Sequence, residues 1–398
     1  MTAANAAPAS VLLPDREGNP ELVRLGPPAA WPRPSRPLAS RSVYAAAHVI
    51  PRTWADTTPG APGDLDWDAT LAYRHEIWSY GLGVADAMDT AQRGMGLDWA
   101  ATRQLIVRSA AAAKYAGGAL VCGAGTDQLA DSAPPSGSAG LDRVADAYRE
   151  QIAVVREAGA GVVLMASRAL ARVATSANDY LRVYGRLLDE VDQPVILHWL
   201  GEMFDPALAG YWGSPDVSTA TSTVVELINS HADKVAGIKV SLLDAAHETT
   251  LRRRLPAGVR LYTGDDFNYP ELIVGDGTHH SDALLGIFAA TYPAASAAVQ
   301  ALDAGDSEQA RKILDSTQAL SRTIFAAPTR YYKTGIAFVS WLNGHQPGFT
   351  MLDGLHGARP LAHLVEVFRQ TDQAGLLCDP ELAAHRMRTL LAVHGWPA

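Results

Sequence analysis

The sequence predicts an α/β protein, a (β/α)8 TIM barrel with an N-terminal β-hairpin-like extension and C-terminal helices. Eight short apolar segments follow one another along the chain, and amphipathic helical stretches separate most of them. Strands that alternate with helices form parallel sheets, and eight such strands close a barrel. An open doubly wound sheet is the alternative, but it requires a Gly-rich phosphate loop after the first strand, where this chain reads AAAHVIP.

The chain divides into three predicted regions. Residues 1–40 form an extension, in which VLLPDREGNPELVRL places two apolar runs around a turn-rich centre, as in a β-hairpin, and a Pro-rich linker follows. Residues 41–291 form the barrel. Residues 292–398 read as helices, a layer that packs on the barrel or on a neighbouring subunit. The predicted barrel strands are 42–50, 81–88, 118–125, 161–167, 194–200, 235–240, 259–264 and 283–289.

The composition excludes several classes of partner. Hydrophobic residues make up 48% of the chain and the net charge is −9, so the charge gives no reason to expect binding to nucleic acid or to an anionic membrane. No apolar run approaches the length of a membrane span, and the segment MTAANAAPAS lacks the features of a secretory signal. Cys122 and Cys378 are too few for a disulfide framework or a thiolate metal site. We therefore expect a soluble, cytoplasmic protein.

Lys239 lies in the middle of an apolar strand, VAGIKVSLLD, residues 235–244. A buried ammonium is costly unless it is paired or deprotonated. Only five of the 33 Lys and Arg residues are lysines, so this chain uses arginine almost wherever a plain cation would serve. Lys239 is either one half of a structural ion pair with a carboxylate of a neighbouring strand, or a Schiff-base nucleophile whose free amine attacks a ketone.

Four segments carry a family resemblance. GIKVSLLDAAHETTLRRRLPAGVRLYTGDD resembles the lysine strand, following helix and next strand of the dihydrodipicolinate synthase / N-acetylneuraminate lyase superfamily. PVILHWLG and AGAGVVLMAS resemble the two strands before it, and YYKTGIAFVSWLNG resembles the superfamily's C-terminal lysine-containing helix. Order and spacing fit from about residue 42 to 378, and the chain looks closest to an uncharacterised dihydrodipicolinate synthase-like branch. The resemblance implies that Lys239 forms the Schiff base and that the protein is a homo-oligomer, with the late helices as candidate interface.

The chain departs from the superfamily at two places. His198 stands where the superfamily carries a proton-relaying tyrosine at the end of the fifth strand. It is a candidate general acid/base because imidazole titrates near neutrality, although an inert core histidine is the alternative. After the second strand the superfamily has a Gly-Thr/Ser-Thr/Ser-Gly-Glu turn that grips a keto-acid carboxylate, where this chain reads MDTAQRGMG. Substrates other than pyruvate are therefore open.

Polar residues near the predicted strand ends are candidates for binding substrate. In the loop after the second strand, Asp89 could bind hydroxyls, Thr90 a polar substrate and Arg93 a carboxylate or phosphate, although an ordinary polar loop explains them equally well. Asp265 and Asp266 could bind hydroxyls, hold the Lys239 ammonium, or cap the next helix.

Two further positions complete the candidates. His279 and His280 precede the eighth strand, and because adjacent side chains rarely point the same way, at most one acts; we take His280 as the candidate. Lys333 is the rival lysine, for which a structural or carboxylate-pairing role is expected.

Three functions remain open from the sequence. The first is a lyase or aldolase that needs no cofactor or metal and acts on a small keto acid or sugar-derived carbonyl through a Lys239 iminium, with His198 as general acid/base. The second is a metal-dependent barrel aldolase or sugar isomerase, in which His48, Asp89, His198 and one of the paired histidines converge. The third is a non-catalytic ligand-binding barrel. Lys239 in its apolar strand, with the matching order of the neighbouring strands, favours the first, and a lysine retained in so lysine-poor a chain argues against the third.

Overall fold

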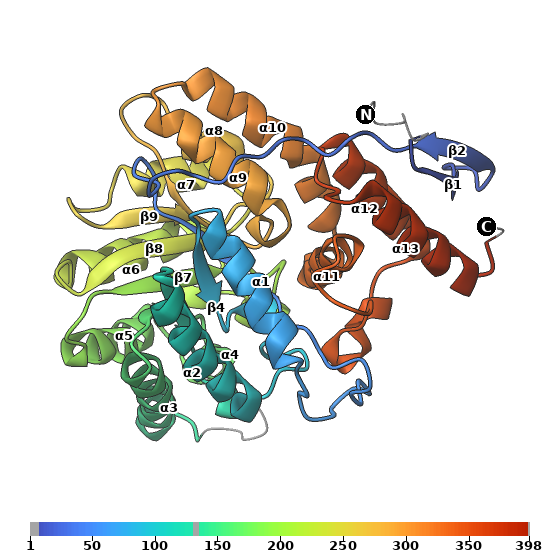
Figure 1. Cartoon of the computed structure of the whole chain (residues 1–398). Helices are drawn as coiled ribbons and strands as arrows, with labels where there is room; N and C mark the ends of the chain where they lie inside the picture. The colour runs from blue at the N-terminus through green and yellow to red at the C-terminus, as the bar shows by residue number, and fades with distance from the viewer. Residues whose placement is uncertain (1–7, 130–134, 397–398) are drawn as a thin grey trace.

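The computed structural model describes residues 8–129 and 135–396, and its centre is a closed barrel of eight parallel strands (Figure 1). The predicted TIM barrel, with its N-terminal hairpin and C-terminal helices, is confirmed. The barrel strands are β3 (Val43–Ala46), β4 (Gly83–Asp86), β5 (Leu120–Ala124), β6 (Gly161–Leu164), β7 (Val195–Leu200), β8 (Val235–Ser241), β9 (Arg260–Thr263) and β10 (Asp282–Leu285).

Helices surround the barrel, and four of them begin at an aspartate cap. Aspartate side chains accept hydrogen bonds from the first-turn amides of α1, α2, α6 and α7, which satisfies donors that have no partner inside a helix. The helices of the barrel are α1 (Trp67–Ser79), α2 (Trp99–Ala116), α3 (Ser138–Glu157), α4 (Arg168–Val173), α5 (Ala177–Glu190), α6 (Val217–Ser230), α7 (Ala245–Arg252), α8 (Tyr269–Val274) and α9 (Phe288–Asp303). The eighth predicted strand, 283–289, is therefore shorter than expected, because α9 already begins at Phe288.

Alternate residues of each strand face the barrel interior. Ile238 and Val240 of β8 belong to the apolar layer between strands and helices, so Lys239 between them faces inward. Lys239 lies opposite His198 of β7 on one side and Tyr262 of β9 on the other. The interior apolar residues are Ala46, Ala85, Met88, Val121, Val163, Met165, Ile196, Tyr262 and Leu284.

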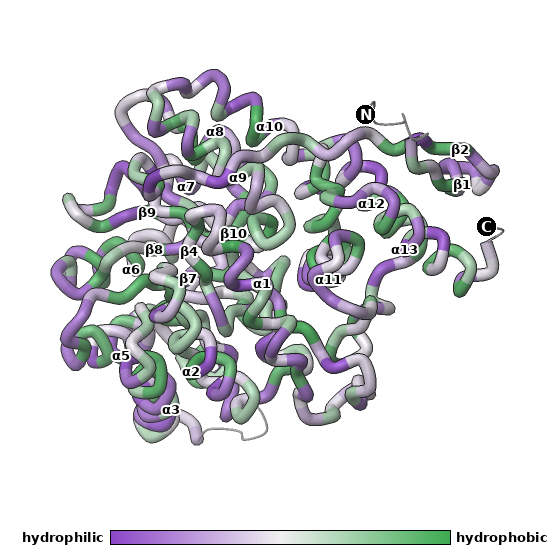
Figure 2. Tube along the Cα trace, in the orientation of Figure 1, coloured by the Kyte–Doolittle hydropathy of each residue, from purple (hydrophilic) through white to green (hydrophobic). Residues whose placement is uncertain are grey.

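The C-terminal helices pack on the barrel and on one another, and hydrophobic segments alternate with hydrophilic ones along them (Figure 2). They are α10 (Ser307–Ile324), α11 (Tyr332–Leu342), α12 (Leu361–Gln373) and α13 (Pro380–Val393). Every residue of α11 is buried within the chain. The apolar surface of α11 is therefore covered by its own chain, and an interface between subunits would need other surfaces than this helix.

The N-terminal hairpin of β1 (Ser10–Pro14) and β2 (Pro20–Arg24) lies against α12 and α13 (Figure 1). Val11 and Leu13 of β1 are buried there, and Arg388 of α13 donates a hydrogen bond to the Ser10 carbonyl at 2.8 Å. The two ends of the chain therefore meet on one side of the molecule. In the part of the chain that the structure describes, no helix combines the length and the apolar character that a membrane crossing demands.

Candidate active site

The Lys239 side chain lies inside the barrel with an exposed fraction of 5%. Within residues 8–129 and 135–396 it has neither a hydrogen-bond partner nor a carboxylate oxygen within 4.0 Å, so the structural ion pair is not formed. Burial lowers the pKa of its amine, and the negative charge of Asp89, joined by that of Asp266 where Asp266 is ionised, offsets only part of this effect. A lysine in these surroundings is the kind that supplies a free amine.

A glycine gives Lys239 its space. A Cβ atom at Gly264 would lie 3.0 Å from Lys239 Cε and 2.7 Å from the Val240 carbonyl oxygen. Any side chain at this position would therefore displace the lysine or the β8 backbone. The glycine of the GDD segment is required by this close approach, which connects the end of β9 to the lysine on β8.

His198 is the strand neighbour of Lys239 and is equally buried. Its Nε2 lies 3.3 Å from the Ser241 hydroxyl, and its Nδ1 has no partner among the described residues. Burial, reinforced by the positive charge of Lys239, holds the pKa of His198 well below its ordinary value. The imidazole is therefore neutral at physiological pH and has a nitrogen free to exchange a proton.

Asp89 begins a short 3-10 helix, Asp89–Ala91, directly after β4, and a residue from far along the chain fixes it. The Tyr332 hydroxyl of α11 donates to Asp89 Oδ2 at 2.7 Å and also lies 2.7 Å from the Thr90 hydroxyl. Burial by itself raises the pKa of Asp89, but the positive charges of Lys239 and its neighbours hold it below its ordinary value. Asp89 is therefore a carboxylate close to Lys239.

Tyr332 is a site residue that the sequence did not reveal. It is buried and stacks on Phe325, with ring centroids 4.3 Å apart. Tyr332 and Asp89, which are in contact, lie 243 positions apart in the sequence. No local pattern signals such a contact, because it depends on how α11 packs against the barrel mouth.

The two adjacent aspartates after β9 have different surroundings. Asp265 Oδ1 accepts from the amides of Phe267 and Asn268 at 2.9 and 3.0 Å, so it fixes the turn that leads into α8. Asp266 Oδ1 accepts from the Ile287 amide at 2.8 Å, and its carboxylate form would raise the pKa of the Lys239 amine. Burial raises the pKa of Asp266 to about 8. Asp266 therefore belongs with the lysine, as a carboxyl that holds its proton at neutral pH, whereas Asp265 serves the turn.

Protein groups surround the guanidinium of Arg93, so its donors are not free to bind a substrate. Its guanidinium donates to the carbonyls of Ala87 and Gly123 at 3.2 and 2.7 Å, to Gln151 Oε1 at 2.6 Å, and to both carboxylate oxygens of Asp127. All five N–H groups of an arginine are used by this set. Arg93 therefore connects the loop after β4 to β5 and α3, and no donor remains for a substrate carboxylate.

A buried ion pair orients the turn that carries Asp89. Arg74 of α1 binds both oxygens of Asp86, at 2.9 and 2.8 Å, and also donates to the carbonyls of His48 and Thr70. Both charged side chains are fully buried. Asp86 is the last residue of β4, and the next residue, Ala87, adopts φ 51°. This pair fixes the backbone from which Asp89 projects.

His280 lies at the other end of the barrel. It is exposed and precedes β10, so it is on the side where the strands begin, whereas Lys239 and Asp89 are near the ends where strands finish. The expectation that His280 contacts substrate is therefore wrong. His48 Nε2 is bonded to Gln346 Oε1 at 3.1 Å. Within the described residues no group of three or more His, Cys, Asp or Glu could hold a metal ion, so the convergence expected of a metal enzyme is not found there.

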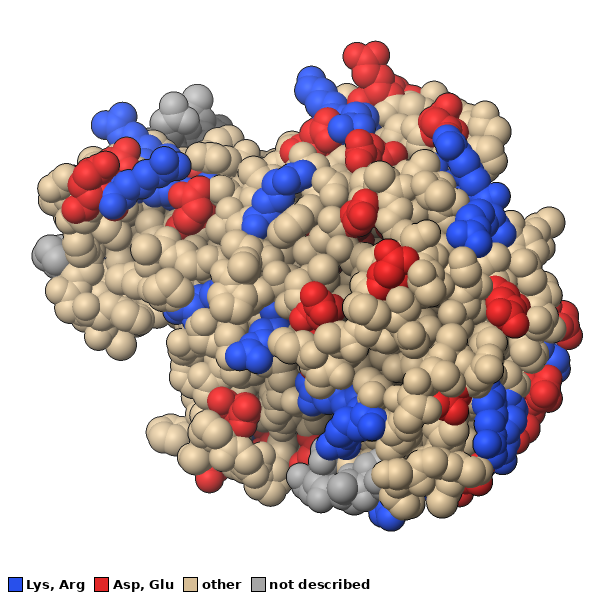
Figure 3. Space-filling view, turned by 180° about the vertical axis from the view of Figure 1, so that it is seen from behind, with Lys and Arg blue, Asp and Glu red and all other residues tan. Residues whose placement is uncertain are grey.

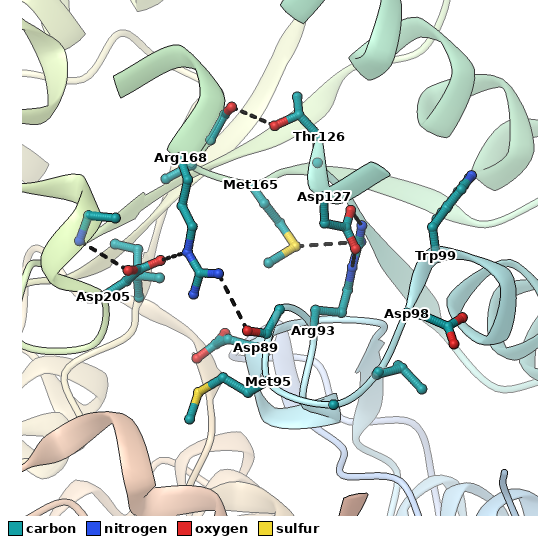
Figure 4. A pocket seen from close by; sticks show the side chains of 18 of the residues that line it. Asp89, Arg93, Met95, Asp98, Trp99, Thr126, Asp127, Met165, Arg168 and Asp205 are labelled. Atoms are coloured by element: carbon teal, nitrogen blue, oxygen red, sulfur yellow. Dashed lines mark hydrogen bonds and ion pairs between the residues drawn. The ribbon is translucent and has the colours of Figure 1, made fainter. Parts of the chain in front are cut away.

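A cavity of about 720 Å³ opens at the mouth of the barrel (Figure 4). Asp89, Leu200, Phe204 and Tyr332 contribute to its wall, whereas Lys239 and His198 do not. Leu200 follows His198 by two positions on β7, so the lysine and histidine lie one interior layer deeper than the wall. Charged residues on the wall include Asp89, Arg93, Asp127, Arg168, Asp205 and Lys333.

Several dihydrodipicolinate synthases have solved structures with the same fold. A monomeric variant matches with a TM-score of 0.64 at 14% identity, over 86% of this chain and 100% of that chain. The enzyme from Thermotoga maritima matches with a TM-score of 0.61 at 13% identity, over 85% and 99%. The chloride-inhibited enzyme from Acinetobacter baumannii, complexed with pyruvate, matches with a TM-score of 0.61 at 15% identity, over 85% and 100%. No curated protein matches the sequence.

These likenesses define the class of the molecule: a (β/α)8 barrel with the fold of the dihydrodipicolinate synthases, as the sequence resemblance implied. At these identities the likeness concerns the fold alone. The sequence profile of a family described as "Protein of unknown function (DUF993)" matches residues 11–396, and the chain belongs to this family.

Proposed function

We propose that the protein is a class I lyase or aldolase that acts on a keto acid or a sugar-derived carbonyl compound through an iminium at Lys239. The observation that carries the proposal is the buried amine of Lys239, which has no anionic partner within 4.0 Å in the described chain and has a lowered pKa. The neighbours with the same fold support it, since one of them is a dihydrodipicolinate synthase complexed with pyruvate.

The groups around Lys239 suit each step of this chemistry. The free amine attacks the carbonyl carbon, and loss of water gives an iminium. In an aldol cleavage the iminium nitrogen accepts the electron pair of the C–C bond that breaks. In a dehydration it accepts the electron pair of an α C–H bond, and the enamine that forms then expels the β-hydroxyl, which takes the electron pair of the C–O bond and leaves as water. Asp266 carries a proton at neutral pH and can give it to the departing water, and neutral His198 can exchange the proton of the substrate.

The iminium keeps a positive charge at the position of the ammonium. The charge of Asp89 that acts on Lys239 therefore also stabilises the intermediate. The positive charge of the iminium, like that of the Lys239 ammonium, opposes protonation of His198, so the imidazole stays neutral through the reaction. A homo-oligomeric state and a cytoplasmic location, both predicted from the sequence, belong to the proposal.

Borohydride trapping tests the proposal. The purified protein is incubated with a panel of keto acids and keto sugars, reduced, and analysed by intact mass and peptide mapping. We expect a ligand-sized mass gain on the peptide that contains Lys239, and no gain in Lys239→Met. Lys312→Met, at an exposed lysine of α10, is the matched control and should still be labelled at Lys239. An adduct confined to Lys333, or none with any compound of the panel, would contradict the proposal.

A further inference from the structure

The ammonium of Lys333 is buried, and no carboxylate of the described residues pairs with it. Lys333 is the second residue of α11, and its side chain lies in the wall of the cavity with an exposed fraction of 2% for the residue. Its Nζ donates to the Arg330 carbonyl at 3.0 Å and to Met95 Sδ at 3.2 Å, and a thioether is a weak acceptor. Across residues 8–129 and 135–396, no carboxylate oxygen lies within 4.0 Å of it. The Tyr332 ring, whose centroid is 4.9 Å from Nζ, adds a cation–π contact. A buried ammonium that has no carboxylate among its partners is costly.

Arg168 reaches into the same cavity from the start of α4. Figure 4 shows its guanidinium extending from Asp205 toward the segment that carries Asp89 and Met95. Its Nε donates to Asp205 Oδ2 at 2.5 Å and its Nη1 to the Gly94 carbonyl at 3.4 Å, while Nη2 has no partner in the described part of the chain. A Cβ at Gly94 would lie 2.8 Å from Nη1, so the glycine allows the guanidinium to lie against this loop.

The acidic residues of the cavity wall match only part of the charge of these two cations. Asp127 is paired with Arg93, and Asp98 accepts from an amide in the first turn of α2. Asp205 pairs with Arg168 through Nε and also accepts from the Ala207 amide. Among the described residues, the Lys333 ammonium therefore has no carboxylate partner, and Nη2 of Arg168 remains as a donor that faces the same loop.

We propose that Lys333 and Arg168 form a subsite for an oxyanion, a carboxylate or a phosphate group of the ligand. The subsite is separate from the reacting amine, because Lys333 and Arg168 line the cavity whereas Lys239 lies one interior layer deeper. The inference that this oxyanion belongs to the carbonyl substrate rests on the proposed function, and it narrows the substrate to a compound that carries an anionic group at a distance from its carbonyl. The anion site itself does not require Lys239.

The charge of Lys333 supports the subsite at neutral pH. Burial lowers its pKa to about 8, with the negative charges of Asp89 and Asp205 acting against this and the positive charges of Arg168 and Arg330 adding to it. The lysine is thus mostly protonated at pH 7, and a bound anion would raise its pKa further. Affinity for an anion should fall as the pH rises through about 8.

Calorimetric titration in a buffer free of other oxyanions tests the subsite, with inorganic phosphate and malonate as probes. We expect the wild-type protein to bind at least one of them, and the stronger of the two identifies the group. Lys333→Met and Arg168→Met should each lower the affinity by about tenfold or more, which corresponds to the loss of one charge-assisted contact. Lys312→Met, at an exposed lysine of α10, should leave the affinity unchanged.

Lys239→Met separates this inference from the proposed function. Retained anion binding in Lys239→Met supports the subsite even if borohydride trapping fails for the wild-type protein. No binding of either anion by the folded wild-type protein would overturn the subsite, as would equal affinity in wild type, Lys333→Met and Arg168→Met. Arg168 is partly exposed, so Arg168→Met keeps the test valid if Lys333→Met does not fold.

Discussion

Tyr332 controls where the carboxylate of Asp89 lies. The hydroxyl binds Asp89 Oδ2, while Asp89 Oδ1 has no partner among the described residues. A carboxylate held in this way acts on Lys239 through its charge but stays beyond 4.0 Å of it. The lysine therefore keeps the lowered pKa that imine formation needs. The Tyr332 hydroxyl therefore favours the free amine of Lys239 over an ion pair between Lys239 and Asp89.

Tyr332→Phe should raise the pH at which Lys239 becomes reactive. Without the hydroxyl, Asp89 can turn toward the ammonium, and a closer carboxylate raises the pKa of a lysine. Under the proposed function, we expect slower borohydride trapping at neutral pH, with the rate recovering at higher pH, and a loss of stability of about 1–2 kcal/mol for the lost hydrogen bonds. The measurement is the trapping rate as a function of pH.

Tyr331→Phe is the control for this experiment. Among residues 8–129 and 135–396, the Tyr331 hydroxyl accepts only from Arg330 and has no contact with Asp89. The trapping profile of Tyr331→Phe should match that of wild type. A Tyr332→Phe profile that loses amplitude at every pH, without a shift, would show that the tyrosine acts on folding alone.

The loop after β4 depends on Arg93 for its attachment to the barrel. The arginine side chain is 3% exposed and its partner Asp127 is 21% exposed. One guanidinium thereby joins this loop, the carbonyl of Gly123 in β5 and Gln151 of α3. The loop carries both Asp89 and Gly94, so both parts of the candidate site depend on this attachment.

Arg93→Met should lower the free energy of unfolding by about 3 kcal/mol, because it leaves Asp127 and Gln151 without their donor in a buried place. Urea denaturation measures this loss. Arg149→Met is the matched control on α3, since the Arg149 ion pairs with Asp146 and Glu190 are exposed and should contribute under about 1 kcal/mol. If Arg93→Met kept the stability of wild type but lost ligand affinity, Arg93 would instead bind the substrate directly, as the sequence analysis expected.

Helix α7 is joined to two strands through a buried acid. Glu248 accepts from the hydroxyls of Thr263 at 3.0 Å and Ser281 at 2.7 Å, and burial raises its pKa to about 8. In the unfolded chain the carboxyl ionises near 4.5. Between these two pH values the folded state holds a proton that the unfolded state has released. Stability from this group is therefore fully present below about pH 4.5 and is lost as the pH rises through about 8.

Glu248→Gln should remove this pH dependence. The amide cannot ionise, so the difference in unfolding free energy between variant and wild type should move in favour of the variant as the pH rises from 4.5 to 8, by on the order of 3 kcal/mol. Thermal unfolding at a series of pH values measures the difference. Glu226→Gln, at an exposed glutamate of α6, should show a constant difference. A constant difference for Glu248→Gln as well would mean that Glu248 ionises normally in the folded protein.

How much of the site could be predicted from the sequence depends on how far apart along the chain its contacting residues lie. The eight strands and the inward direction of Lys239 could be predicted, because alternation within a strand is a local pattern. The enclosed Arg93 could not, since its partners lie on separate elements 30 to 58 positions away. Lys333 could be expected in a helix, but only the packing of α11 on the barrel mouth brings it beside Met95.

The candidate site is built from residues of the barrel together with residues of the C-terminal helices. Tyr332 and Lys333 belong to α11, which also packs against α10, α12 and α13. The N-terminal hairpin covers α12 and α13 in turn. On the face opposite to that of Figure 1, basic and acidic side chains are interspersed over the barrel and these outer elements alike (Figure 3). Stability of the C-terminal helices should therefore determine whether the site is complete.

Leu13→Ala tests whether hairpin, C-terminal helices and barrel unfold together. Leu13 of β1 is fully buried, so the substitution should cost about 2–4 kcal/mol. If the molecule is one cooperative unit, calorimetry should show a single transition at a lower temperature, and ligand trapping at Lys239 should be lost at that same temperature. Leu22→Ala, at a 60% exposed leucine of β2, should change the free energy of unfolding by about 0.5 kcal/mol or less. A separate early transition in Leu13→Ala, with the main transition unchanged, would instead mean that the region 292–398 and the hairpin form a unit of their own. The site would then lose Tyr332 and Lys333 while Lys239 remained in a folded barrel.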